Sequence, residues 1–266
     1  MNQAKFPRVA AALAAVVCSP ALFAQVIVNE TFDYADQAAL DVNWNLGANS
    51  PLSLNTGVGN PAPSVDNPAT GTNPNIWAGS TFSLTPSDAN PIRLTADITS
   101  SGTVGSVTTV GLRQQGGINP LFEMGIYRIF DNVQTGPSSA AAGSGSGIGV
   151  RTVNIGESLP GPQNWVKMGE YYTGTARFEA TFTELSVVTR VDLGIDGSWD
   201  LEYTETGTTS IGAFGDFRIH APAAATTGTG GASVDNLRLE VVPEPSTFAL
   251  FGLGGLAFAM LRRRKG

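Results

Sequence analysis

The stretch that decides the fold is Thr175-Ala-Arg-Phe-Glu-Ala-Thr-Phe182, in which polar and apolar residues alternate without a break. Because successive side chains of a strand point to opposite faces of a sheet, the polar residues share one face and the apolar residues the other. This is the pattern of an antiparallel sheet with one buried and one solvated face. Asp196-Gly197, which lies between two further runs of this kind, predicts a hairpin turn.

Other short runs rich in β-branched and aromatic residues are separated by Gly, Pro, Asn, Asp and Ser, as expected of strands and turns. They cover residues 26–32, 93–98, 106–113, 122–130, 149–155, 170–172, 187–194, 199–204, 214–220 and 233–242. The sequence indicates one short helix, at 35–40. We therefore predict an all-β chain, with a single antiparallel two-sheet β-sandwich or jelly roll over residues 25–242.

Three stretches rich in Gly, Pro, Asn and Ser interrupt this pattern, at 55–75, 136–147 and 221–231. The runs that flank them are too few to build separate cores, so we expect long surface loops on one sandwich rather than domain linkers. Gly143-Ser-Gly-Ser-Gly147 lacks the Lys and Ser/Thr of a phosphate-binding loop, and we expect it to be flexible.

The charge balance excludes one class of partner. The 266 residues hold 15 Lys and Arg against 22 Asp and Glu, a net charge of −7. Residues 25–242 hold 9 of the 15 cations and 21 of the 22 acids, a net charge of −12. Nucleic-acid binding needs clustered Lys and Arg, so we exclude it.

A single Cys and a single His also exclude a disulfide framework and a multi-His metal centre.

The N-terminus has the pattern of a secretory signal peptide over residues 1–24. Lys5 and Arg8 precede a short apolar run, and Ala24 closes it before Gln25. The run is too short to span a hydrocarbon core of about 30 Å. We expect the Sec export machinery and signal peptidase as partners, with cleavage after Ala24.

The C-terminus, residues 243–266, combines three elements in order. Pro243-Glu244-Pro245 is followed by an apolar stretch at 247–261 and by the cations Arg262, Arg263, Arg264 and Lys265. We expect a single transmembrane helix over 247–261 in the inner membrane, with the basic tail at 262–265 held in the cytoplasm by the positive-inside rule. The domain at 25–242 would then lie on the other side of the membrane.

These C-terminal elements together resemble the PEP-CTERM sorting signal of Gram-negative bacteria. The resemblance implies that the chain is a substrate of an exosortase, a membrane protease or transpeptidase that acts near Pro243, Glu244 and Pro245. It also implies a protein of the cell envelope or the biofilm matrix, made by bacteria that secrete exopolysaccharide. We expect transient anchoring in the inner membrane with the domain in the periplasm, then delivery to the outer surface or the extracellular matrix of a Gram-negative bacterium.

A second resemblance rests on two short segments of the predicted sandwich. Asn29-Glu-Thr-Phe-Asp-Tyr-Ala-Asp36 with Trp44, and Ala232-Ser-Val-Asp-Asn-Leu-Arg-Leu-Glu240, are similar to the first and last strands of concanavalin A-like lectin and glucanase domains. In those jelly rolls the two terminal strands pair with each other. The glucanases carry their catalytic acids as Glu-x-Asp-x-Glu or Glu-x-Asp-x-x-Glu on one strand.

The nearest match to that acid motif is Asp200-Leu-Glu-Tyr-Thr-Glu205, which has the acids in the wrong order. Alternation places Asp200 and Glu202 on one face, and Glu205 joins them only if the strand contains a bulge. Glycosidases need two carboxylates a few Å apart. We therefore expect a protein that is not an enzyme. The alternative is a divergent glucanase-like hydrolase, and its candidate catalytic residues are Asp200, Glu202 and Glu205.

Aromatic rings could bind carbohydrate by stacking on sugar rings. Trp77 and Trp165 lie beside loop-like segments and are the preferred candidates among the four tryptophans. We expect no cofactor, although structural Ca²⁺ stays open, because carboxylate and amide oxygens at 131–132, 196 and 235–236 could ligate it. The hypothesis is an exported, non-enzymatic envelope protein that could bind exopolysaccharide; a purely structural or adhesive surface protein is the further alternative.

Overall fold

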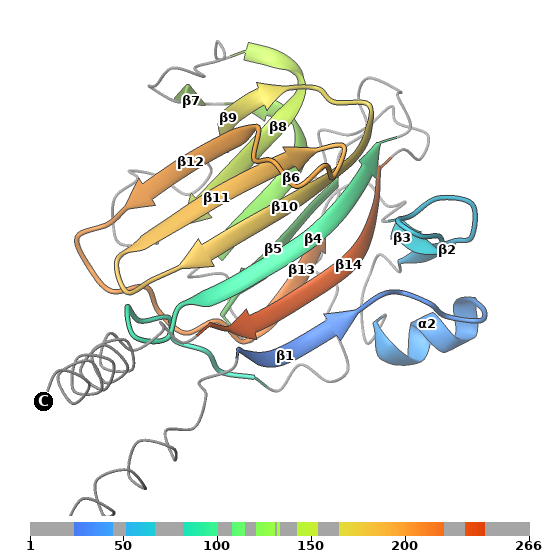
Figure 1. The fold of residues 1–266 in the computed structure, drawn as a ribbon, viewed down its shortest axis with the longest axis horizontal. Coiled ribbons are helices and arrows are strands. Elements are labelled where there is room, and N and C mark those ends of the chain that lie inside the picture. Colours follow the sequence, from blue (N-terminus) through green and yellow to red (C-terminus); the bar gives the residue numbers. More distant parts are fainter. Residues whose placement is uncertain are drawn as a thin grey trace, which may run out of the picture.

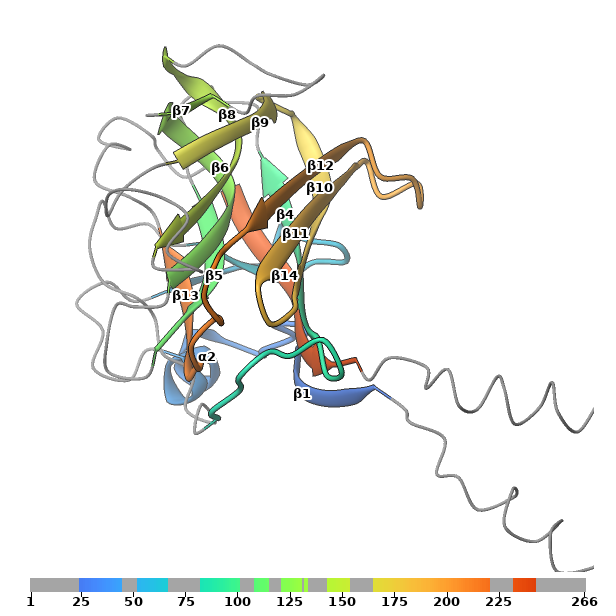
Figure 2. The ribbon, with the colours of Figure 1, turned by 90° about the vertical axis from the view of Figure 1, so that its left-hand side faces the viewer.

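The computed structural model describes residues 24–44, 52–66, 82–100, 108–114, 121–130, 132–133, 143–153, 165–220 and 232–242. In this part of the chain two β-sheets pack face to face (Figures 1 and 2). One short helix, α2 (Gln37–Asn43), lies at the edge of the sandwich. The chain is therefore an all-β, two-sheet antiparallel sandwich, as predicted.

The eight-stranded sheet faces the viewer in Figure 1, where β14 lies between β4 and β1. Its order is β12 (Leu201–Thr206), β11 (Ser186–Leu193), β10 (Gly174–Phe182), β4 (Ile92–Ser100), β14 (Ala232–Val241), β3 (Ser64–Asp66) and β2 (Ser53–Asn55). β1 (Gln25–Glu30) pairs antiparallel with the C-terminal half of β14. The first and last strands of the domain are thus neighbours.

The six-stranded sheet lies behind it. Its order is β13 (Asp216–His220), β5 (Thr108–Arg113), β6 (Leu121–Phe130), β8 (Gly143–Val153), β9 (Trp165–Glu170) and β7 (Asn132–Val133). β7 and β9 are parallel, and the other described pairs are antiparallel. The two sheets bury a common apolar core between them.

Strand alternation fills that core as the sequence predicts. On β10 the side chains of Ala176, Phe178, Ala180 and Phe182 are buried, and the polar residues between them are partly exposed. The Phe182 ring packs edge-on against Phe122 of the facing sheet, with centroids 4.8 Å apart. Full burial of such a side chain contributes about 1.5–3 kcal/mol to the stability of the fold. A substitution of Phe182 by alanine would therefore lower the free energy of unfolding.

The segment after β1 is organised by the Glu30 carboxylate. It accepts hydrogen bonds from the Phe32 amide (2.7 Å), the Tyr34 hydroxyl (2.7 Å) and Trp44 Nε1 (3.2 Å). Burial and this contact with Glu30 raise the pKa of Tyr34. A single acid therefore holds the loop and the end of α2 against the core, where Trp44 is fully buried.

The structure corrects several boundaries. The expected strand at 170–172 is β9 at Trp165–Glu170, the strand at 199–204 is β12 at Leu201–Thr206, and the helix at 35–40 is α2 at Gln37–Asn43. Part of the loop expected at 55–75 forms β3. The segment at 143–147, expected to be flexible, begins β8 because it pairs with β6, with Gly147 opposite Tyr127. Backbone pairing outweighs the low strand propensity of glycine here.

Candidate functional site

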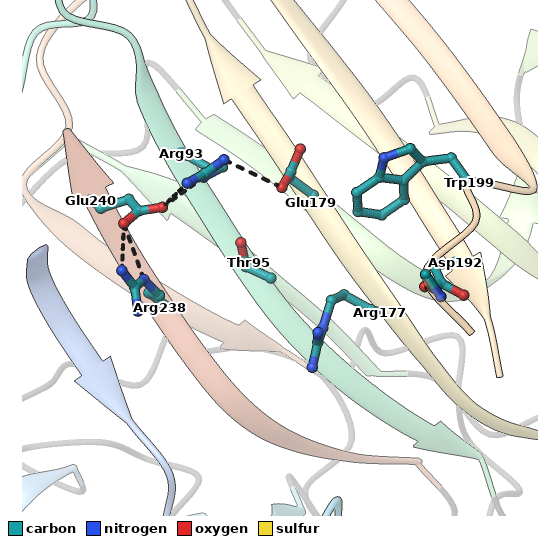
Figure 3. A pocket seen from close by; sticks show the side chains of 9 residues that line it. Arg93, Thr95, Arg177, Glu179, Asp192, Trp199, Arg238 and Glu240 are labelled. Carbon is teal, nitrogen blue, oxygen red and sulfur yellow. Dashed lines mark hydrogen bonds and ion pairs between the residues drawn. The ribbon is translucent and has the colours of Figure 1, made fainter. Parts of the chain in front are cut away.

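The outer face of the eight-stranded sheet is polar because the apolar residues of each strand point inward. On β4, Leu94, Ala96 and Ile98 lie in the core, so Arg93 and Thr95 point outward. The same alternation places Arg177 and Glu179 of β10 and Arg238 and Glu240 of β14 on this face. Figure 3 shows these side chains together over the sheet.

Arg93, Arg238 and Glu240 form an ion-pair cluster on this face. Arg93 Nε donates to Glu240 Oε1 (2.6 Å), and Arg238 Nη2 donates to Glu240 Oε2 (2.7 Å). Burial alone would raise the pKa of Glu240, but the hydrogen bonds from Arg238 and Arg93 outweigh it and lower that pKa. Glu240 is thus held ionised although its side chain is only 3% exposed.

Glu179 lies on the neighbouring strand, between Arg93 and Arg190. Its carboxylate is 4.0 Å from Arg93 Nη1, which is beyond hydrogen-bonding distance. Burial raises the pKa of Glu179, and the charges of Arg93 and Arg190 oppose that rise. The Glu179 oxygens, 16% exposed as a side chain, can therefore accept hydrogen bonds from a ligand.

A second row of polar groups crosses the same face. Arg177 donates from Nε and Nη2 to the two carboxylate oxygens of Asp97, at 2.8 and 2.9 Å. Asp97 is fully buried and also accepts hydrogen bonds from the side-chain amides of Asn60 and Asn236. The two hydrogen bonds to Asp97 fix the Arg177 side chain and raise the pKa of Arg177.

Trp199 stands at the edge of this face on the turn between β11 and β12. Asp192 accepts hydrogen bonds from the amides of Asp196 (3.0 Å) and Gly197 (2.9 Å), and Asp200 accepts one from the Leu193 amide (2.7 Å). Gly197 has a φ of 92°, which favours glycine in this turn. The Trp199 side chain, 43% exposed, is therefore presented by a turn with a fixed backbone.

Together these residues line an open depression of about 400 Å³. Its walls are Arg93, Thr95, Arg177, Glu179, Asp192, Gly197, Trp199, Arg238 and Glu240 (Figure 3). An indole ring, several guanidinium donors and carboxylate acceptors all border one space. Such a set can hold a molecule that has both an apolar face and many hydroxyl groups.

The outer face of the six-stranded sheet also carries ion pairs, but buried ones. The Glu123 side chain is 0% exposed and lies 3.1 Å from Arg151 Nη1 and 3.2 Å from Arg218 Nε. Gly111 stands between Glu123 and Arg218 in the register and has no side chain to separate them. A Cβ at Gly111 would lie 1.8 Å from the Phe122 carbonyl oxygen, so glycine is required.

The structure separates the three acids of the hydrolase alternative. Glu202 is exposed and bonds to Arg190 (2.8 Å), and Asp200 bonds within the turn. Glu205 is 7% exposed, is buried on the other face and accepts a hydrogen bond from Tyr203. β11 and β12 pair in unbroken register from Val187–Glu205 to Val191–Leu201, so no bulge brings Glu205 to the face of the other two.

Of the two preferred sugar-stacking tryptophans, Trp165 does not line this depression. Trp165 is 2% exposed and stacks on Tyr127 with centroids 4.0 Å apart, so it lacks an open ring face. Trp77 lies outside the described residues. Trp199 is one of the four candidate tryptophans in the sequence but not a preferred one; the signal in its favour is its position two residues after Asp196-Gly197, where a hairpin turn presents side chains to solvent.

The oxygens proposed for calcium are engaged in hydrogen bonds where they are described. Asp235 accepts from the amides of Asn60 and Asn236, and Asp196 accepts from the Ser198 amide. Burial raises the pKa of Asp235, and the charge of Asp97 adds to the rise. Within the described ranges, no three His, Cys, Asp or Glu side chains are grouped as a metal site.

Both expected sorting segments lie outside the described residues. They are the signal peptide at 1–24, apart from residue 24, and the C-terminal motif at 243–245 with the helix at 247–261 and the basic tail at 262–265. Among the helices that the structure describes, none is both long and apolar enough to span a bilayer.

Comparison with protein families identifies the C-terminal segment. Residues 241–265 match the PEP-CTERM protein-sorting motif. The motif implies an exported, membrane-anchored chain with an exosortase as its processing partner. A comparison with curated protein sequences finds no significant match.

Several solved structures are similar at low identity. They include the CBM2 module of the Lactobacillus casei BL23 phage J-1 evolved Dit (12% identity, 82% of this chain and 96% of that chain, TM-score 0.41). Arcelin-5, a lectin-like defence protein from Phaseolus vulgaris, has 7% identity over 82% of this chain and 98% of its own, with a TM-score of 0.41. The VIP36 exoplasmic/lumenal domain in its Ca²⁺/Man3GlcNAc-bound form has 10% identity over 80% and 90%, with a TM-score of 0.40.

Proposed function

We propose that this chain is an exported, non-enzymatic protein of the cell surface or extracellular matrix that binds saccharide in the depression beneath Trp199. The observation that carries the proposal is the exposed indole ring of Trp199 beside a polar sheet face. The sorting motif at 241–265 supports export. Secreted exopolysaccharide is the saccharide that such a protein meets.

The indole ring supplies the apolar half of the recognition. One face of a sugar ring is made of C–H groups, which pack on an aromatic face. Asp192, Asp196 and Asp200 accept hydrogen bonds from backbone amides of the turn that carries Trp199, so this backbone is ordered before any ligand arrives. A turn that is already ordered loses less conformational entropy on binding, which favours affinity.

The sheet supplies the polar half. Arg93 and Arg177 present N–H donors at side-chain exposures of 36% and 38%, and Glu179 presents acceptors. Planar guanidinium and carboxylate groups can each bind two neighbouring hydroxyls of a sugar. Because Arg93 and Arg177 are each hydrogen-bonded to a carboxylate on an adjacent strand, these two donor groups have a fixed spacing.

The absence of turnover remains part of the proposal. Glycoside hydrolysis uses two carboxylates that reach one bond. The separation of Asp200 and Glu202 from Glu205 across the sheet supports a binding role. In the alternative, a purely structural or adhesive protein, the depression would bind no saccharide.

The experiment uses residues 25–242 on a panel of bacterial exopolysaccharides and their oligosaccharides, followed by calorimetry. We expect Trp199→Ala to weaken binding about tenfold or more, as expected for the loss of about 1.5 kcal/mol of aromatic contact. Leu185→Ala is the matched control, because Leu185 is 40% exposed but outside the depression.

Equal binding by Trp199→Ala and wild type would contradict the proposed site. Hydrolysis of a polysaccharide that Glu202→Gln abolishes would contradict the non-enzymatic role. Silence of the folded wild-type domain over the whole panel would favour the structural alternative.

A further inference from the structure

The two ends of the sandwich meet in one backbone ladder. Gln25, the first residue after the predicted signal peptide, pairs with Val241 on β14. The other edge of β14 pairs with β4, where Val241 lies opposite Ile92. Figure 1 shows β14 held between β4 and β1. The last residue before the Pro-Glu-Pro element, Val242, donates its amide to the Pro91 carbonyl (2.8 Å).

The sorting motif therefore starts within the folded sheet. The matched segment begins at residue 241, and Pro243 follows directly after the anchored amide of Val242. No residues are left over as a spacer between the sheet and Pro-Glu-Pro. A processing enzyme commonly binds its substrate as an extended strand and uses main-chain contacts on both sides of the bond it cleaves.

Withdrawal of the end of β14 would disrupt much of the sheet. Residues 238–241 of β14 are paired on both edges, Leu237 pairs with Glu30 of β1, and the Leu237 and Leu239 side chains are fully buried. The Glu240 carboxylate binds Arg93 and Arg238. An enzyme that needed residues 237–242 in its active site would have to break all these contacts first.

We propose that the folded sandwich sets the N-terminal limit of exosortase processing and also slows it. The enzyme reaches Pro243 and the residues after it, but not β14. In the cleavage step one peptide C–N bond at or beyond Pro243 breaks. The carbonyl carbon gains a bond to the oxygen of water or the nitrogen of an amine, and that nucleophile's proton goes to the released amine. This limit does not depend on what the depression beneath Trp199 binds.

The test expresses the full chain in a bacterium that has its own exosortase. A Gly-Ser-Gly-Ser spacer is inserted between Val242 and Pro243, and the same tetrapeptide is inserted between Thr56 and Gly57, in the exposed β2–β3 turn, as the control. Pulse-chase gels give the rate of processing, and intact-mass spectrometry gives the new C-terminus. Resistance of the exported domain to protease confirms that each variant is folded.

We expect the spacer at 242/243 to speed processing severalfold, the control insertion to leave the rate unchanged, and the wild-type product to end at or after Pro243. A product that ends within 232–242 would overturn the limit. An unchanged rate of processing with the spacer at 242/243 would overturn the claim that the folded sandwich slows processing.

Discussion

Both sheets carry arginine–carboxylate pairs on their outer faces, but the two faces differ in burial. On the eight-stranded sheet the side chains of Arg93, Arg177, Arg190 and Arg238 are 36–43% exposed. On the six-stranded sheet those of Arg113, Arg151 and Arg218 are 12–13% exposed. The arginines of the six-stranded sheet are thus buried together with their partners, whereas those of the eight-stranded sheet reach solvent even where the partner, Glu240 or Asp97, is buried.

This comparison predicts a gradient of effects on stability, set by the burial of the charge that loses its partner. A buried charge without its partner keeps its desolvation cost, whereas an exposed one is solvated by water.

The largest effect is expected at Glu123. Glu123→Ala removes the carboxylate that Arg151 and Arg218 share and leaves two largely buried cations near each other. We expect a loss of about 3–5 kcal/mol in the free energy of unfolding, measured by urea denaturation. A loss below about 1 kcal/mol would mean that this cluster is not part of what holds the six-stranded sheet.

Arg177 is expected to give an intermediate effect, because it is half-exposed but its partner Asp97 is fully buried. Arg177→Met keeps the alkyl packing and removes the two charged hydrogen bonds. Asp97 retains the bonds from Asn60 and Asn236, so we expect a loss of about 1–3 kcal/mol. An unchanged midpoint in urea would show that the two amides alone satisfy Asp97.

Glu240 adds a dependence on pH. Its pKa is lowered in the folded protein, so its contribution to stability is present above the usual glutamate pKa and is lost as the pH falls through the folded value. We expect Glu240→Gln to reduce the fall in stability between about pH 6 and about pH 3 by up to about 1 kcal/mol. Thermal unfolding of both proteins across this range measures the difference. Parallel stability curves for the wild type and Glu240→Gln would contradict a lowered pKa of Glu240 in the folded protein.

The smallest effect is expected at the exposed pair of Arg190 and Glu202, whose side chains are 39% and 54% exposed. Glu202→Gln should change the free energy of unfolding by no more than about 0.5 kcal/mol. Saccharide binding should also be unchanged, because Glu202 lies outside the depression. A loss above about 2 kcal/mol would contradict the link between burial and cost.

Local pattern predicts much of this fold and little of its site. The alternation at 175–182 predicts the burial of Phe178 and Phe182 because a strand has only two faces. The pattern does not say which tryptophan stays outside. Trp165 is buried because Tyr127 comes from β6, 38 positions earlier in the chain, to stack on it. That contact depends on strand order, which no local run of residues encodes.

The polar rows depend on register in the same way. Arg177 meets Asp97 because β10 and β4 pair those two positions directly, and they are 80 residues apart in the chain. A shift of one residue would exchange the buried and exposed faces. The sorting motif needs no such information, because its three elements are contiguous, and it was identified from the sequence alone.

The most direct test of the saccharide site is acrylamide quenching of tryptophan fluorescence in a Trp77→Phe background. Trp44 and Trp165 are shielded at 0% and 2% exposure, so quenching reports mainly on Trp199, at 43%. The ligand is the oligosaccharide with the highest affinity in the panel. We predict that saturation with it lowers the quenching constant because the sugar covers the indole ring. Saturable binding that leaves the quenching unchanged would place the ligand elsewhere on the protein.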